Sequence, residues 1–372
     1  MASPITPPSV ARRTLSTPII LALILIALAL LALVSGSRPF NQTMIDLFLR
    51  VVLVVGLYIF IGNSGVMSFG HIGFTCLGGY AAAWLTMPPM MKETLLPGLP
   101  EWLMQTQLPY WAGALFAALW AAVWAALFGK ILMRLSGIAA SIATFAMLAM
   151  INTVYSNWES VTAATSSVVG IPIIRSIWPY LIAAILAVFI AWGHAISRAG
   201  LALRAARDEP TAAAASGVDI PRERLTAFVI SGAVMGMGGA LFAHSIGVVT
   251  PDTFYLTLTF TTLSMLVVGG IGSLSGAVLG VVILSSLIQA LRWLEAGVTI
   301  GTTTVAIPNG LQEITLGIVM VVILAFRPSG IMANSELVWP CARPENPDDL
   351  SGNKPTQPTS IQPTPIQQGA TK

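Results

Sequence analysis

The chain has 372 residues, of which 55% are apolar and only 9% are charged. Soluble domains carry about 25% charged residues, so this composition excludes an ordinary soluble enzyme and indicates a protein that meets a lipid bilayer. The formal net charge is +3, from 18 Lys and Arg against 15 Asp and Glu. Because no basic stripe with interleaved aromatic residues accompanies it, this excess does not indicate a nucleic-acid partner.

Ten apolar runs are long enough to cross about 30 Å of hydrocarbon as helices, so the sequence predicts an all-α, polytopic membrane helix bundle. In chain order they are Pro18–Val34, Met44–Ile61, Val66–Met87, Tyr110–Gly129, Gly137–Tyr155, Trp178–Ile196, Leu225–Val248, Leu256–Gly270, Leu274–Leu291 and Leu311–Phe326. Glycine-rich runs among them could be broken helices. The first run also resembles a cleavable signal peptide, but its length favours a membrane anchor.

The Lys and Arg residues predict that both ends of the chain are cytoplasmic, because short cytoplasmic loops carry an excess of positive charge. With the N-terminus inside, ten crossings place Arg12, Arg13, Lys130, Arg134, Arg198, Arg204, Arg207, Arg222, Arg224 and Arg327 on the cytoplasmic side. Only Arg38, Lys92, Arg175 and Arg292 fall in outer loops. The Leu256–Gly270 and Leu274–Leu291 runs are either two spans joined by a tight turn or a re-entrant hairpin.

The composition divides the chain into a transmembrane domain, residues 1–330, and a tail, residues 331–372. The tail is rich in Pro, Thr, Gln and Ser. Such a segment buries too little apolar area to offset the entropy of ordering, so we expect a disordered cytoplasmic tail.

The segment from Arg198 to Arg224 holds the one dense cluster of charges between the predicted spans, nine in all. Asp208 is expected to cap a short helix over Glu209–Ser216, and Gly217 to end it. The small side chains of that helix allow close approach to a groove, and the flanking charges offer contacts to a partner protein. The alternative is a solvated connector whose arginines only set the topology.

A second candidate site is the glycine-rich segment that contains Asn63, Ser68, Gly70 and His71. A broken helix there would aim backbone amides at a substrate carboxylate, whereas the alternative is tight packing of small residues. Glu313, near the outer end of the last run, is a further candidate to line a substrate path.

Other polar residues give no sign of chemistry. Asp46 and Arg50 are spaced to pair on one helix face near the outer membrane surface, which is typical of an interfacial anchor. The three His and two Cys residues are scattered, so no metal site is predicted. Motifs such as H-E-x-x-H and G-x-S-x-G do not occur, so no catalytic residues are predicted and the chain is not expected to be an enzyme. An ion-coupled secondary transporter is the alternative, but it would require ionisable residues deep in the spans.

Five stretches in order along the chain resemble those of one known family. They are GNSGVMSFGHIGF (Gly62–Phe74), SRAGLALRAARDEPTAAAASGVD (Ser197–Asp219), LTAFVISGAVMGMGGAL (Leu225–Leu241), LVVGGIGSLSGAVLG (Leu266–Gly280) and FRPSGI (Phe326–Ile331). Together they resemble the permease subunits of branched-chain amino-acid ABC importers, specifically the M-type subunit. The resemblance spans residues 44–331 and leaves out the tail.

This resemblance implies a permease of an ATP-driven importer in the bacterial inner (plasma) membrane. The implied partners are a second, H-type permease, two cytoplasmic ATPase subunits and a periplasmic substrate-binding protein. The implied substrates are branched-chain amino acids, or the urea, short-chain amides or aromatic acids that relatives carry. Contact with the ATPases would run through Arg204, Arg207, Asp208, Glu209, Ala212, Ala213 and Gly217. ATP and Mg²⁺ would bind to the partners, since this chain has no G-x-x-x-x-G-K-[ST] phosphate loop and no cofactor is expected in it.

Overall fold

The computed structural model describes residues 8–295, 298–300, 303–305, 315, 317–319, 321–322, 326–327, 330–332 and 335–337. Within this part of the chain, eight helices are long and apolar enough to cross a membrane, which confirms the polytopic helical bundle. They are α1 (Pro8–Ser35), α2 (Arg38–Ser64), α6 (Tyr110–Leu132), α7 (Gly137–Asn157), α9 (Trp178–Ile196), α12 (Ile220–Ile246), α13 (Leu256–Gly269) with the preceding 3₁₀ turn η1 (Pro251–Phe254), and α14 (Leu274–Glu295).

These eight helices correspond to eight of the ten predicted spans. The predicted span Val66–Met87 forms the shorter helix α3 (His71–Thr86), whose 16 residues are all buried. It is shorter than predicted because the chain leaves the helical conformation at Gly65, which has a φ of +68°, and resumes it only at His71. The tenth predicted span, Leu311–Phe326, lies mostly outside the described residues.

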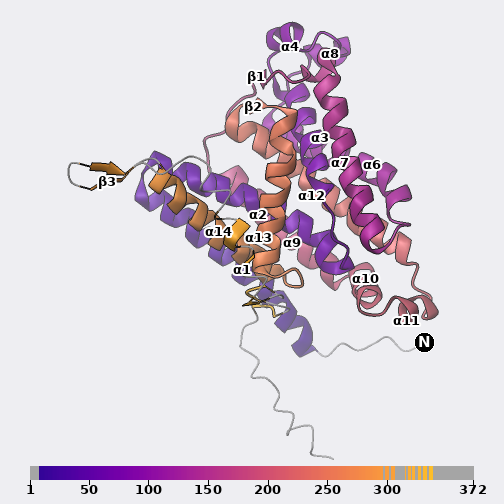
Figure 1. Cartoon of the computed structure of the whole chain (residues 1–372). Helices are drawn as coiled ribbons and strands as arrows, with labels where there is room; N and C mark the ends of the chain where they lie inside the picture. The colour runs from indigo at the N-terminus through magenta and orange to yellow at the C-terminus, as the bar shows by residue number, and fades with distance from the viewer. Residues whose placement is uncertain are drawn as a thin grey trace, which may run out of the picture.

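The connecting segments gather at two ends of the bundle (Figure 1). At one end are α4 (Pro89–Leu95), α5 (Glu101–Gln105), α8 (Glu159–Thr162) and the antiparallel pair β1 (Val168–Val169) and β2 (Val248–Val249). At the other end are α10 (Arg198–Asp208) and α11 (Pro210–Ala215). A hairpin of β3 (Val298–Ile300) and β4 (Thr303–Val305) follows α14. These short strands and outer helices are not anticipated by the apolar runs.

Contacts between loops agree with the sides that the Lys and Arg residues predict. At the outer end, the Gly98 amide donates to the Ser160 carbonyl at 2.9 Å, and Trp84 Nε1 donates to the Val161 carbonyl at 3.0 Å. At the cytoplasmic end, the Arg224 guanidinium donates to the Leu135 carbonyl at 3.1 Å. The two predicted outer loops therefore lie together, as do the two predicted cytoplasmic loops, and which end of the bundle faces the cytoplasm stays a prediction.

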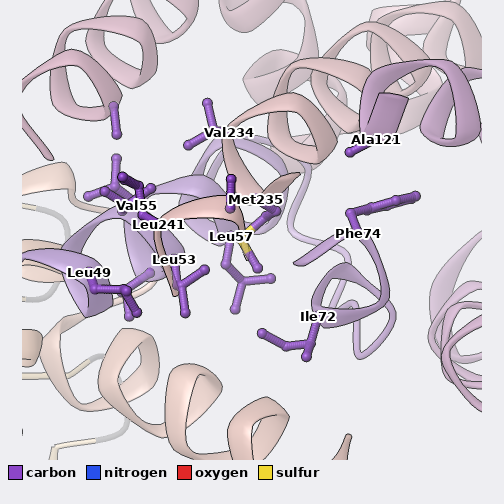
Figure 2. Packing of buried hydrophobic residues seen from close by; sticks show 14 of the residues in the cluster. Leu49, Leu53, Val55, Leu57, Ile72, Phe74, Ala121, Val234, Met235 and Leu241 are labelled. Carbon is purple, nitrogen blue, oxygen red and sulfur yellow. The ribbon is translucent and has the colours of Figure 1, made fainter. Parts of the chain in front are cut away.

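Helix α2 lies in the middle of the bundle, and every residue from Val51 to Ser64 is buried. Its apolar residues show no single face, which is typical of a helix enclosed on all sides. Figure 2 shows Leu53 and Leu57 of α2 beside Met235 of α12. The core of the molecule is therefore built around α2 and the helices that contact it.

Helix α12 approaches α3 and α6 closely because all three present small residues at the contact. On α6, the buried positions recur every four residues, at Gly113, Ala117, Ala121, Ala125 and Gly129. A Cβ atom added to Gly236 of α12 would lie 2.4 Å from the Ala121 Cβ, and one added to Gly239 would lie 2.0 Å from the Thr75 carbonyl oxygen of α3. Such stripes of small residues are the usual way for membrane helices to maximise contact.

The first residues of the predicted tail pack onto the bundle, which corrects the domain boundary placed after residue 330. The Ile331 amide donates to the Val268 carbonyl at 2.9 Å, and the Ser273 hydroxyl donates to the Ser335 carbonyl at 2.7 Å. The Glu336 carboxylate accepts from the amides of Leu274 and Ser275, at 2.7 and 3.0 Å, and so caps α14. The boundary therefore lies beyond Leu337, and the rest of the predicted tail lies outside the described residues.

Candidate coupling segment and substrate path

The cytoplasmic segment between α9 and α12 is a succession of capped short helices. Ser197 caps α10 by accepting a hydrogen bond from the Gly200 amide at 3.2 Å. Glu209, rather than the predicted Asp208, caps α11 by accepting from the Thr211 amide at 3.4 Å. Asp208 instead ends α10 and pairs with Arg207 at 3.2 Å. The cap moves by one residue because Pro210 occupies the first position of α11, where its missing N–H is not needed.

Gly217 ends α11 as predicted, with a left-handed φ of +85°. The Val218 amide then donates to the Ala213 carbonyl at 3.1 Å, which satisfies a carbonyl at the end of the helix. Asp219 follows at once and caps α12 by accepting from the Arg222 amide at 3.3 Å. The segment therefore has a defined shape although its helices are short.

The predicted coupling residues separate into an outward and an inward set. Asp208, Glu209, Ala212 and Gly217 are exposed. Ala213 is buried against α10 and α12, which leaves Ala212 on the free side of α11.

Arg204 and Arg207 point toward the bundle, not toward solvent. Arg204 donates to the Ala195 carbonyl at the end of α9. Arg207 donates through Nη1 to the Gly62 carbonyl of α2 at 2.8 Å. Its aliphatic carbons lie so close to Gly65 that a Cβ atom there would be 2.5 Å from the Arg207 Cγ. These two arginines therefore connect the coupling segment to the transmembrane helices.

Leu201 is a surface residue that the sequence reasoning missed. It lies on α10, in the cytoplasmic charged segment, and its side chain is 54% exposed. On the same face Ala205 and Asp208 are exposed one and two turns further along. The amphipathic pattern of α10 could have revealed Leu201. Leu203 and Ala206 form the buried face of that helix, and Leu201 is a large apolar residue that lies off this face.

The predicted substrate-path residues lie in the packed interior at the break between α2 and α3. Asn63, Ser68 and His71 are each at most 2% exposed. Ser68 Oγ lies 2.7 Å from His71 Nδ1, and the ring of His71 packs against Phe60 and Phe228 at 5.2 and 5.0 Å.

Gly70 is held against α7, where an added Cβ atom would lie 2.4 Å from the Thr144 carbonyl oxygen. The segment is therefore a broken connection that is also tightly packed, so it combines the two alternatives left open by the sequence. Glu313 lies outside the described residues. A role for these residues in a substrate path stays a prediction.

Asp46 and Arg50 share the outer half of α2 with a third charged residue from another helix. Both line a small cavity with Thr43, Gln289 and Arg292. Arg292, predicted to be in an outer loop, belongs to α14 because that helix continues to Glu295. This cluster therefore includes residues of both α2 and α14. The spacing in the sequence predicted only a pair on one helix, Asp46 and Arg50, that anchors it at the membrane surface.

Two larger cavities are apolar and open between helices. One of about 560 Å³ lies between α6 and α7 and is lined by residues that include Trp120, Trp124 and Tyr155, and another of about 490 Å³ includes Trp111 and Trp178. Among the described residues, no group of His, Cys, Asp and Glu is placed to hold a metal ion.

Comparison with known proteins agrees with this architecture. The family described as "branched-chain amino acid transport system / permease component" matches residues 40–324. The chain belongs to this family. It is a permease subunit of an ABC importer and a multi-pass protein of the inner membrane.

Relatives of this permease include two M-type proteins. It is 26% identical over 349 residues to the high-affinity branched-chain amino acid transport system permease protein LivM of Salmonella typhimurium, covering 84% of this chain and 74% of the relative. The LivM protein of Escherichia coli gives the same identity and coverage. A segment of 83 residues is 34% identical to a probable branched-chain amino acid transport permease protein LivH of Methanocaldococcus jannaschii, covering 22% of this chain and 25% of the relative. No solved structure matches the chain at a level that indicates a relationship.

Proposed function

We propose that this permease carries branched-chain amino acids into the cell together with a second, H-type permease. Two cytoplasmic ATPase subunits supply the energy, and a periplasmic binding protein delivers the substrate. The substrate is supported by the names of the LivM relatives, and the paired permease by the similarity of one segment to a LivH protein. ATP and Mg²⁺ bind to the ATPase subunits, because the chain lacks a phosphate-binding loop.

The single observation that carries the ATPase contact is the exposed face of α10 and α11. Leu201 of α10 and Ala212 of α11 are exposed, and so are the charged residues Asp208 and Glu209 between them in the chain. An isolated helix as short as α11 is marginal in water, so docking in a groove would stabilise it. A free apolar side chain amid charges is typical of an interface between proteins.

The two inward-pointing arginines, Arg204 and Arg207, connect this contact to the membrane-spanning helices. When ATP closes the two ATPase subunits, α11 moves with the groove that holds it. Arg204 and Arg207 attach α10 to the ends of α9 and α2. The movement of the cytoplasmic helices thereby tilts the spans and alternates the access of the substrate to the two sides.

A bulky residue at Ala212 tests the contact. Since Ala212 is exposed and lies on the free side of α11, Ala212→Trp will leave the permease folded but reduce substrate-stimulated ATP hydrolysis by about tenfold, as the loss of a central interface contact does. The measurement is ATP hydrolysis and co-purification of the ATPases with the complete transporter in proteoliposomes.

Ala212→Ser is the matched control, because it keeps a small side chain at the same position and is expected to retain stimulation. Normal assembly and normal stimulated hydrolysis in the Ala212→Trp complex would contradict the contact. Gradient-driven uptake by the chain alone in proteoliposomes would contradict the ATP-driven assignment and favour an ion-coupled transporter.

A further inference from the structure

The exposed surface of α13 in the membrane domain is more polar than that of α6. On α6, the exposed residues form an aliphatic row typical of contact with lipid, Leu115, Leu119, Val123 and Leu127. On α13, the exposed residues in the outer half are Thr257 and Phe260, with Thr261 half-buried beside them. The Thr261 hydroxyl donates to the Thr257 carbonyl at 2.7 Å, and small polar residues of this kind are enriched where membrane helices contact one another.

Helix α7 presents a similar row toward the same region. Ser141, Phe145, Asn152 and Ser156 are spaced by four, seven and four residues, which places them on one helix face. The amide nitrogen of Asn152 is buried and has no hydrogen-bond partner among the described residues. A polar row with a free amide donor on α7 therefore accompanies the hydroxyl row of α13.

Three phenylalanines from three different elements meet between these rows. The ring of Phe69 lies 6.5 Å from Phe145 of α7 at an interplanar angle of 90°, and 6.4 Å from Phe260 of α13 at 63°. Both geometries are the edge-to-face type that attracts aromatic rings. Phe260 is nevertheless 52% exposed and Phe145 38%, so the group sits at a surface and is not part of the core.

Phe69 is set in this place by the loop Gly65–Gly70, which is fastened to α7. The Ser141 hydroxyl donates to the Met67 carbonyl at 2.7 Å, and the Phe69 amide donates to the Thr144 hydroxyl at 3.4 Å. Gly70 packs against the backbone of the same turn of α7. The loop therefore holds Phe69 against Phe145 although it has no regular structure.

The opposite end of this loop touches the coupling segment. Arg207 donates to the Gly62 carbonyl one turn before the loop begins, and its side chain packs on Gly65. Only the few residues from Gly65 to Phe69 separate the Arg207 contact from the aromatic group. A short, packed connection of this kind can carry a displacement, provided that both ends have two positions.

We propose that Phe69, Phe145 and Phe260 form the gate of the translocation path, and that the Gly65–Gly70 loop carries the movement of Arg207 to Phe69. On the outer side of the gate, Asn152 and Thr257 offer hydrogen bonds to the charged groups of a small amino acid, while the rings match an apolar side chain. Movement of Phe69, together with α7 to which its loop is fastened, away from Phe260 of α13 opens the gate. The link to ATP rests on the proposed function, but the gate itself does not.

Removing the ring of Phe69 tests the gate in the complete transporter. Phe69→Ala loses both ring contacts, and each is worth a factor of roughly 2 to 10. Labelled leucine will therefore leak through the variant without ATP, about tenfold faster than through the wild-type complex. Phe189→Ala is the control, because Phe189 of α9 is 37% exposed on a lipid-facing helix and is expected to cause no leak. Leakage equal to that of the wild type would overturn the gate.

The Arg207 contact is tested by a different readout. Arg207→Met keeps the aliphatic packing on Gly65 but loses the hydrogen bond to Gly62, so fewer leucine molecules will be carried for each ATP hydrolysed, without a leak. Arg207→Lys is expected to restore part of the ratio. An unchanged ratio in Arg207→Met would overturn the link and leave the gate intact, whereas failure of the Ala212 experiment would overturn only the ATPase contact.

A labelling experiment keeps the proposal falsifiable if Phe69→Ala does not fold. In a Cys341→Ser background, Thr257→Cys will react with a membrane-impermeant thiol reagent added from the outer side, because it faces the aqueous path. Leu119→Cys on the lipid face of α6 will not react. If the reagent failed to label either cysteine, the α13 face that contains Thr257 would not line the translocation path.

Discussion

Lys92 is the most deeply buried charged residue of the described chain outside the spans. Its ammonium group in α4 is fully buried and donates to the carbonyls of Leu103 and Thr106. Burial lowers the pKa of Lys92 from 10.5 to about 8. The side chain thereby joins α4 to the end of α5 and fixes the outer segment that connects α3 to α6.

The stability of this outer segment is expected to rise as the pH increases from about 8 to 10.5. Below pH 8, Lys92 is charged in both states, and the folded state bears the full cost of burying the ammonium. Between the two pKa values the unfolded chain binds more protons, so the free energy of unfolding increases with pH. Proteolysis of residues 88–109 in the purified permease, measured at pH 7.5 and 9.5, checks this.

Lys92→Met provides the comparison, since it removes the titrating group while keeping a long side chain. The variant leaves the carbonyls of Leu103 and Thr106 without this donor, at a cost of about 1–3 kcal/mol. The protease should therefore cleave its outer segment faster, and the stability of that segment should not rise with pH. A rise of the same size in the variant would show that another group is responsible.

At the scale of helices, the sequence predicts the spans well and their contacts poorly. The predicted Trp178–Ile196 coincides with α9, and the predicted start at Gly137 coincides with that of α7, because polar and proline residues bound these apolar runs. The break after α2 begins at Gly65, whose φ of +68° lies in the left-handed region that favours glycine. The direction of Arg207 could not be predicted, since it depends on a carbonyl 145 positions earlier in the chain. The same holds for the aromatic contacts of Phe69, which join three separate elements.

Glycine residues at the contact between α12 and α3 allow a specific prediction about stability. Gly239→Ala would bring a methyl group to 2.0 Å from the Thr75 carbonyl of α3, and neither backbone can yield. Overpacking of this kind typically costs about 1–3 kcal/mol, so the melting temperature of the detergent-solubilised permease should fall.

Gly193→Ala in α9 is the matched control, because no atom lies within 4 Å of the added carbon. It removes backbone freedom from the unfolded chain and should leave the melting temperature unchanged or raise it slightly. Equal melting temperatures for the two variants would show that α3 and α12 are less closely packed than described.

At the scale of the whole molecule, charge marks the two sides of the membrane. Helices α10 and α11 lie at one end of the bundle (Figure 1), the end that the Lys and Arg residues predict to be cytoplasmic. The composition alone separates the tail from the spans, but it places the boundary too early. Residues 331–337 mix apolar and polar side chains and predict no element, and only the hydrogen bonds of Ile331, Ser335 and Glu336 to the turn between α13 and α14 and to the start of α14 show where they belong.

Two truncations locate the functional end of the chain. Removal of residues 338–372 is expected to leave stability and transport unchanged, since their composition suits a passive extension. Removal of residues 331–372 also deletes the Glu336 cap, which is worth about 0.5–2 kcal/mol, and should lower the melting temperature. Full-length Glu336→Ala should reproduce most of that loss. Equal effects of the two truncations would contradict the boundary beyond Leu337.

The cap of α14 also has a consequence for synthesis of the chain. The carboxylate that satisfies the Leu274 amide comes 62 positions later in the sequence. At about 5–20 residues per second, the ribosome needs roughly 3–12 s to supply it after Leu274 is made. During that interval the start of α14 must rely on water or on other protein groups at the cytoplasmic surface. The start of α14 therefore receives its cap only after the ribosome has synthesised the residues that follow the last predicted span.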